Sequence, residues 1–378
     1  MKLSVIIISP TKFNSFFCKA LFFLAFALST SALYSQAFTT TWEVPENDKH
    51  IEITVNTGNY NYNYTINWGD GTVQNNQTDN ATHTYTSAGT YTVEITGTFP
   101  TILMNNSADK SKLISIEQWG NIAWQSMNSS FRDCNNLVIS DNAGSPDLSN
   151  VTDASDMFRA SGITATGNLN SWDVSNITDM YQMFNRAGSF NGDISAWNTA
   201  KVTNMSYMFT GATSFDQDIS RWDLSSIPDD SNVLRNMFEA ASLSPENYDA
   251  LLIRWSIDDS VNPNDNIDDI PQNIIFDAGD SKYCSSEAVT ARTVLRDTYG
   301  WTITDGGQAQ DCFEPFILTF DTSFGTGGTT ITLPIVSGSY DVDTNNDAVF
   351  ELTDQSGTQT IDLGTSGCLL YTSPSPRD

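Results

Sequence analysis

Histidine and basic residues are scarce in this chain. Its 378 residues include 2 His, and 17 Lys and Arg stand against 45 Asp and Glu, which gives a formal net charge of −28. Neither His50 nor His83 has a nucleophile or a metal-ligand residue at motif spacing, and the sequence contains no glycine-rich phosphate loop. So acidic a surface also repels phosphate backbones. The sequence therefore predicts neither an enzyme nor a nucleic-acid-binding protein.

A long apolar run is missing as well. The apolar run at residues 20–28 follows Lys12 and Lys19 and is too short to span a membrane. Small and polar residues come next, so residues 1–36 are typical of a signal peptide that is removed on export. The alternative is a buried strand or helix of the mature fold. We expect a secreted or cell-surface protein that is not an integral membrane protein.

Cysteines are few, and two of the five lie in terminal segments, Cys18 and Cys368. The other three are Cys134, Cys284 and Cys312. Export permits disulfides, and Cys284 and Cys312 are the best candidate pair because they flank one compact segment. Two free buried thiols are an equal alternative, because sequence alone does not fix the pairing.

The end of the chain, residues 368–378, differs from everything before it. Its sequence, CLLYTSPSPRD, resembles the translation of a transposon-end sequencing adapter. We therefore expect the natural chain to continue beyond Gly367, and any attachment to the outer cell surface to lie in that continuation. A disordered Pro/Ser tail is the alternative.

What the chain does contain is a repeat. Three tryptophans are spaced 25 residues apart, and four Met-Phe steps recur in register with them. These positions are Trp172, Trp197 and Trp222, and Met157-Phe158, Met183-Phe184, Met208-Phe209 and Met237-Phe238. A fixed period in the twenties is typical of a solenoid in which each unit covers the apolar face of the next. Function should then lie on an extended surface, not in a pocket.

Each repeat is predicted to combine a short helix with an extended segment. Residues 179–185 and 204–210 place Met and Phe at i, i+3 and i+4, which is one face of a helix. Ser, Thr, Asn and Asp before the Met are natural N-caps, and residues 173–178 read as an extended edge.

Rows of Met and Trp could also form a cofactor site or a sugar-stacking platform. Residues that recur once per coil stack on their own copies in the core, so we expect both types to be buried. An exposed Trp would indicate a ligand platform instead.

Residues 37–100 read as a small β-sandwich. Residues 51–55 and 60–68 alternate in the manner of strands, and a Trp68-Gly-Asp-Gly turn follows. After it come His83-Thr-Tyr85 and a strand from Tyr91 to Ile95. This pattern resembles the PKD-type immunoglobulin-like domain, which implies a spacer or a weak binding unit. We expect Asp70 to close the turn through local backbone bonds rather than to bind a ligand.

Two segments are predicted to cap the repeats of residues 151–242. Residues 101–150 resemble a degenerate first repeat that covers the open core. Residues 243–312 contain two capped helical patterns, which begin near Ser244 and Ser285. The repeats, the Asn247-Tyr-Asp helix and the ending from Tyr299, YGWTITDGG, resemble the BspA-type leucine-rich-repeat-like surface proteins, also called the DUF285 family. The resemblance covers about residues 101–308. It implies an exported protein of Bacteroidota or another microbe, associated with surface adhesion.

Residues 313–367 look like the start of a second β-module. They contain one site-like motif, Asp343-x-Asn345-x-Asp347 with Asp354 at the twelfth place, which could wrap Ca²⁺. The sixth place holds Ala348 where the pattern requires glycine, and a solvated hairpin turn is the simpler interpretation. Asp193 and Asp218 align between repeats and could also hold a cation, although a hydrated acidic ridge is the simpler interpretation.

The expected fold is thus mixed α/β: a repeat solenoid preceded by a PKD-like β-sandwich. The expected function is a non-catalytic binding or adhesion protein, secreted or on the cell surface, with an extracellular protein or glycan as its partner. Two alternatives remain: a non-catalytic accessory region of a larger secreted enzyme, and a structural component of a surface layer.

Overall fold

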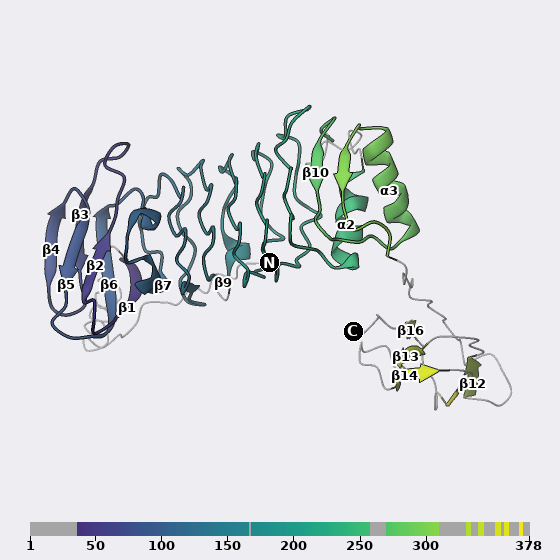
Figure 1. The fold of residues 1–378 in the computed structure, drawn as a ribbon, viewed down its shortest axis with the longest axis horizontal. Helices are drawn as coiled ribbons and strands as arrows, with labels where there is room; N and C mark the ends of the chain where they lie inside the picture. Colours follow the sequence, from purple (N-terminus) through teal and green to yellow (C-terminus); the bar gives the residue numbers. More distant parts are fainter. Residues whose placement is uncertain are drawn as a thin grey trace, which may run out of the picture.

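The computed structural model describes residues 36–165, 168–257 and 270–309, together with five short strands after residue 329. Most of its elements are strands, and the described part is elongated (Figure 1). Strands β1–β6 are Phe38–Val44, His50–Ile53, Asn63–Asn67, Val73–Gln77, Ala81–Thr84 and Gly89–Thr98. Strands β7–β11 are Leu113–Gln118, Val138–Ile139, Thr164–Ala165, Ile275–Asp277 and Thr302–Thr304. The α-helices are α2, Pro245–Trp255, and α3, Ser286–Asp297. Short 3-10 turns are η1, Met104–Asn106; η2, Lys110–Lys112; and η3, Leu169–Ser171.

The N-terminal sandwich and the region after it share one sheet. The strand order is β4-β3-β6-β1-β7-β8-β9. Strand β1 pairs antiparallel with β6 of the sandwich on one side and with β7 on the other. From β7 onward the pairing is parallel, as Ser115 pairs with Val138 and Val138 with Thr164. The sandwich is closed by a second sheet of β2 and β5. It is therefore joined to the repeat region by backbone hydrogen bonds as well as by the chain.

The predicted helices of the repeats are wrong, so the fold is mostly sheet with few helices rather than mixed α/β. Residues 179–186 form successive turns, with Gln182 and Arg186 at φ 55° and 59°. Those φ values lie in the left-handed region and cannot continue an α-helix. Alternate N–H groups point to the next unit: Phe158 donates to Met183 (2.9 Å), and Phe184 donates to Met208 (3.0 Å). The turns thus stack as parallel ladders, which Figure 1 shows as a row of side-by-side segments.

The Met-Phe and Trp positions are buried, as predicted. Stacked Phe rings run through the core, with centroids 5.7 Å apart for Phe158 and Phe184 and again for Phe184 and Phe209. Trp197 and Trp222 also stack, at 6.2 Å, and are 3% and 0% exposed. The Trp197 indole N–H donates to the carbonyl of Leu169 in the preceding unit (2.8 Å). These tryptophans hold neighbouring units together and offer no stacking surface to a ligand.

Side chains close the corners of the units. Asp153, Asp179 and Asn204 each accept a hydrogen bond from the backbone N–H two residues later, at 2.9, 2.8 and 3.1 Å. The same turn recurs at Asp173 and Asp223. Short Asp and Asn side chains favour such turns because their oxygens reach their own backbone. Each unit therefore changes direction at fixed, side-chain-closed corners.

The far end of the repeat row is covered by α2, α3 and the parallel pair β10–β11 (Figure 1). Both helices begin at predicted caps, Ser244 and Ser285, whose side chains accept from Asn247 and Ala288. A buried carboxylate ties this part together. Asp305, 3% exposed at its side chain, binds Arg292 of α3 at 2.7 Å and accepts from the Tyr248 hydroxyl of α2 at 2.8 Å.

The last described elements are strands β12–β16: Thr330–Leu333, Ser339–Asp343, Leu352–Ser356, Gln359–Asp362 and Leu370–Thr372. β12 pairs with β15, and β13 pairs with β14 and β16. Among the cysteines, Cys134 is a buried free thiol, whereas Cys284 is disulfide-bonded to a partner outside the described residues. The predicted signal peptide, residues 1–36, lies outside the described residues except for its last residue.

Candidate functional site on the turn face

The stacked turns form one side of the repeat row, which we call the turn face. Their Met and Phe side chains are buried, and several side chains between them are part-exposed or exposed. This face is formed by residues 126–133, 153–160, 179–186, 204–211 and 233–240. Along each segment, alternate N–H groups donate to the following unit, and the intervening carbonyls accept from the preceding one. Most backbone groups here are therefore already paired between units. Chemistry on this face has to come from side chains.

Two tyrosines and an arginine form a strip across three units of this face, called here the tyrosine strip: Tyr181, Tyr207 and Arg235. The two rings pack edge-on, with centroids 5.9 Å apart and planes 80° apart. The guanidinium carbon of Arg235 lies 5.1 Å from the Tyr207 ring centroid, within cation–π range. Both tyrosines are part-exposed and Arg235 is exposed. Rigid aromatic rings beside an arginine are the side chains most enriched at the energetic centres of interfaces.

Carboxylates flank the strip. Asp153 and Asp179 occupy equivalent corners of neighbouring units, and burial together with repulsion from Asp153 raises the pKa of Asp179. Asp156 is paired with Arg132 at 3.7 Å and Arg159 at 3.2 Å. Arg132 and Arg159 are thus paired with carboxylates, whereas Arg186 and Arg235 form no ion pair with a described residue.

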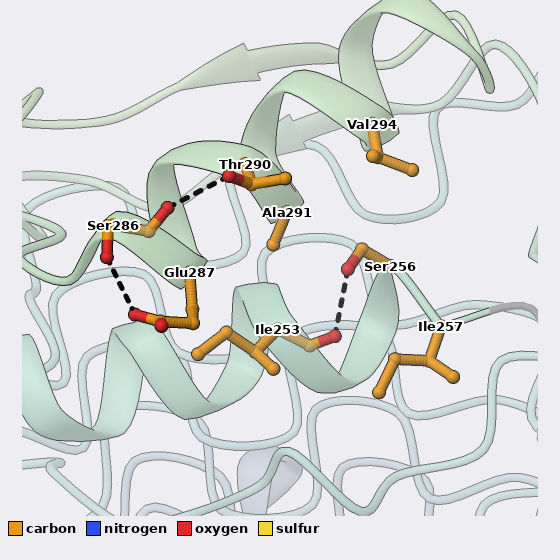
Figure 2. Close-up of a pocket in the computed structure, with 8 residues that line it drawn as sticks. All are labelled: Ile253, Ser256, Ile257, Ser286, Glu287, Thr290, Ala291 and Val294. Atoms are coloured by element: carbon orange, nitrogen blue, oxygen red, sulfur yellow. Dashed lines mark hydrogen bonds between the residues drawn. The ribbon is translucent and has the colours of Figure 1, made fainter.

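A groove lies between α2 and α3, and Figure 2 shows the residues that line it. It has a volume of about 310 Å³. Apolar side chains line it from both helices, with Ile257 40% exposed at its rim. Its hydroxyls are satisfied internally, since Thr290 donates to the carbonyl of Ser286 and Ser256 donates to the carbonyl of Ile253. The groove could hold an apolar side chain, but it gathers no set of reactive groups.

The structure does not describe the side chains of the four predicted Ca²⁺ ligands. Asn345 and Asp347 lie outside the described residues, whereas Asp343 and Asp354 fall on β13 and β14, whose side chains are not described. Within the described ranges no three His, Cys, Asp or Glu side chains gather at metal-binding distance. The Ca²⁺ site stays a prediction.

The other carboxylates singled out from the sequence have local structural partners. Asp70 accepts from the Thr72 N–H at 2.9 Å, as the turn interpretation predicts, and its second oxygen lies 2.7 Å from His83 Nε2. Asp193 accepts from the Ser195 N–H at 3.0 Å, and Asp218 from the Ser220 N–H at 2.9 Å. These contacts close turns.

The tyrosine strip does not follow from the repeat pattern of the sequence. Tyr181 aligns with Ser206 of the next unit, and Tyr207 aligns with Gln182. The two tyrosines therefore break the repeat pattern instead of following it. A search for large aromatic residues at outward positions that are polar in the other units would have found them.

Comparison with known families confirms both resemblances, to the DUF285 family and to the PKD domain. Residues 125–250 match the family described as "Mycoplasma protein of unknown function, DUF285", and residues 31–101 match the PKD domain, a common extracellular module. No curated protein and no solved structure matches the chain in the same comparisons. Across the described ranges, none of the helices has the length and apolar composition needed to cross a membrane. Residues 125–250 of this chain therefore match the DUF285 family, and residues 31–101 match a PKD domain.

Proposed function

We propose that this protein is a non-catalytic, extracellular binding protein, secreted or held at the cell surface. In this proposal residues 101–309 form a solenoid of units of about 25 residues, and the PKD sandwich covers one of its ends. The parallel hydrogen bonds between equivalent residues of neighbouring units support the solenoid. The PKD match and the predicted signal peptide support an extracellular location.

The tyrosine strip is the observation that carries the binding role. The repeats bury their Trp and Phe side chains, yet Tyr181 and Tyr207 stay part-exposed on the turn face. The two rings pack against each other and against Arg235 on the outside of the repeats, and neither belongs to the buried Phe and Trp stacks. They supply contact area at low entropic cost, because a tyrosine has few rotatable bonds.

A binding panel tests this function. The purified chain is applied to immobilised matrix proteins (collagen, laminin and fibrinogen), to neutral polysaccharides and to anionic polysaccharides. The face variant Tyr181→Ala/Tyr207→Ala is compared with the control Lys201→Ala/Thr203→Ala, which changes exposed side chains outside the turn face.

We expect saturable binding to at least one surface, weakened at least about tenfold in the face variant and unchanged in the control. Binding to no surface, or equal binding by the face variant and the wild type, would contradict a binding role for the turn face.

A further inference from the structure

The tyrosine strip has unused hydrogen-bonding capacity, and so has Gln182, which follows Tyr181 and lies at the position equivalent to Tyr207 in the preceding unit. Within the described part of the chain, the hydroxyls of Tyr181 and Tyr207 and the side-chain amide of Gln182 have no hydrogen-bond partner. Arg235 makes its ring contact with Tyr207 but has no hydrogen bond or ion pair there. A hydroxyl or an amide both donates and accepts hydrogen bonds. These groups therefore suit a partner that also offers donors and acceptors together.

The backbone of this face argues against an extended peptide as that partner. Peptides that add to a sheet do so through unpaired N–H and C=O groups at an edge. On the turn face those groups already join the units, as in Gln182 to Ser206 (3.1 Å) and Tyr207 to Arg235 (3.0 Å). A bound chain must be recognised by side chains alone.

Charge argues against an anionic partner. Arg235 is the cation of the strip, but the corner carboxylates Asp153 and Asp179 lie in the same ladders, and Glu239 holds the amide of Asn236 (2.8 Å). The chain as a whole carries −28. Acidic polysaccharides, nucleic acids and acidic proteins are repelled at long range by such a field.

Apolar contact is limited as well. The large hydrophobic side chains that are exposed among the described residues are Val73, Ile257 and Ile275, none of which belongs to the turn face. Protein interfaces usually bury an apolar centre within a polar rim. On the turn face, the two part-exposed tyrosine rings offer the aromatic surface.

We infer that the tyrosine strip binds a neutral carbohydrate chain that lies across the repeat units. The inference rests on the proposed function and names the class of its ligand. The C–H faces of sugar rings pack against the exposed tyrosine surface, and the sugar hydroxyls exchange hydrogen bonds with Tyr181, Gln182 and Tyr207. Because the strip crosses three units, it contacts successive sugars of a chain. A polymer therefore binds more tightly than a monosaccharide.

Affinity electrophoresis tests the inference. The purified chain migrates through native gels that contain a neutral polysaccharide (mannan, xylan, a β-1,3-glucan or starch) or an anionic one (alginate, pectate or heparin). The variants are Tyr181→Ala/Tyr207→Ala, Gln182→Ala and the control Lys201→Ala/Thr203→Ala. A thermal melt of each variant confirms that it is folded.

We expect at least one neutral polysaccharide to retard the wild type, with little change between low and high salt because no counterions are released. The double tyrosine variant should lose at least about tenfold in affinity, Gln182→Ala less, and the control nothing. Retardation that survives in the double tyrosine variant, retardation by anionic polysaccharides alone, or no retardation by any neutral polysaccharide would overturn the inference. If no neutral polysaccharide retards the chain, but a matrix protein binds the wild type and not the double tyrosine variant, the binding function stands and the carbohydrate ligand is overturned.

Discussion

Phe38, in the first strand of the N-terminal sandwich, packs edge-on against Trp124 of the repeat region, with ring centroids 5.1 Å apart. Phe38 also stacks on Trp119, at 5.9 Å, and all three side chains are fully buried. The core of the PKD domain and the core of the repeats therefore meet without a break. The PKD domain thus shares buried side-chain contacts with the residues that follow it.

The first prediction concerns this junction. Phe38→Ala should destabilise the sandwich and the repeats together, by about 3–5 kcal/mol, because the ring is lost from a shared core. Calorimetry should show a single transition that moves to lower temperature. Val73→Ala, at a side chain 50% exposed on β4, is the control and should change little. A repeat transition that stays in place while the sandwich melts alone would contradict the shared core.

The second prediction concerns the corner carboxylate Asp179. Its pKa is raised in the folded state by burial and by Asp153, so the folded protein binds a proton more tightly than the unfolded chain. The stability gained from that proton is present below the unfolded pKa, about 4, and is lost as the pH rises through the folded pKa. Asp179→Asn keeps the turn, as Asn204 does in the next unit, and should stabilise the protein at pH 7.

Thermal melts between pH 3 and pH 8 check this prediction. The difference between Asp179→Asn and the wild type should grow as the pH rises and disappear near pH 3. The reverse change, Asn204→Asp, should introduce a new penalty at neutral pH. A variant that is less stable than the wild type at pH 7 would show that the carboxylate is favourable where it lies.

The third prediction concerns the backbone of the stacked turns. Ala160 has φ 51°, and the equivalent position two units later is Gly211, at φ 67°. A residue with a Cβ atom costs about 1–2 kcal/mol in this region, whereas glycine adopts it freely. Ala160→Gly should therefore raise the free energy of unfolding by up to about 1 kcal/mol. Gly211→Ala should lower it by a similar amount, as measured by urea denaturation. The same sign of change in both variants would contradict this account.

The fourth prediction concerns the ion pair of half-buried Arg292 and buried Asp305. Asp305→Ala leaves the half-buried guanidinium and the Tyr248 hydroxyl without their acceptor, and should cost about 2–4 kcal/mol. The exposed pair of Arg296 and Asp297 provides the control, and Arg296→Ala should cost less than about 1 kcal/mol. Chemical denaturation measures both. Equal losses in the two variants would mean that the pair does not hold α3 to α2 and to the residue after β11.

Much of this architecture could be predicted from the sequence, because the buried residues recur at a fixed spacing. Trp197 and Trp222 recur once per unit and stack in the core, and Ser244 and Ser285 mark the starts of α2 and α3. The helices of the repeats were predicted wrongly because Met and Phe at i, i+3 and i+4 are also brought to one side by the stacked turns. The left-handed residues Gln182 and Arg186 leave no such periodic signal.

The junction between the sandwich and the repeats, and the candidate site, could not be predicted from local sequence patterns. Strand β1 pairs with β7 across more than 70 positions, as Thr40 does with Ile116. Local sequence patterns do not predict such distant pairing. The tyrosine strip escaped notice because Tyr181 and Tyr207 are 26 residues apart but occupy neighbouring, not equivalent, positions of their units. Repeat analysis finds the residues that recur, whereas this site consists of residues that do not.

Hydroxyl-radical footprinting of the tyrosines tests most directly whether the turn face is the binding surface. The chain is oxidised with and without a saturating polysaccharide or matrix protein that it binds, and each tyrosine is quantified by mass spectrometry. We predict that Tyr181 and Tyr207 become protected by the ligand, while Tyr60 and Tyr91 of the PKD domain are oxidised as before. Unchanged oxidation of Tyr181 and Tyr207 at saturation would contradict the account and place the ligand elsewhere on the molecule.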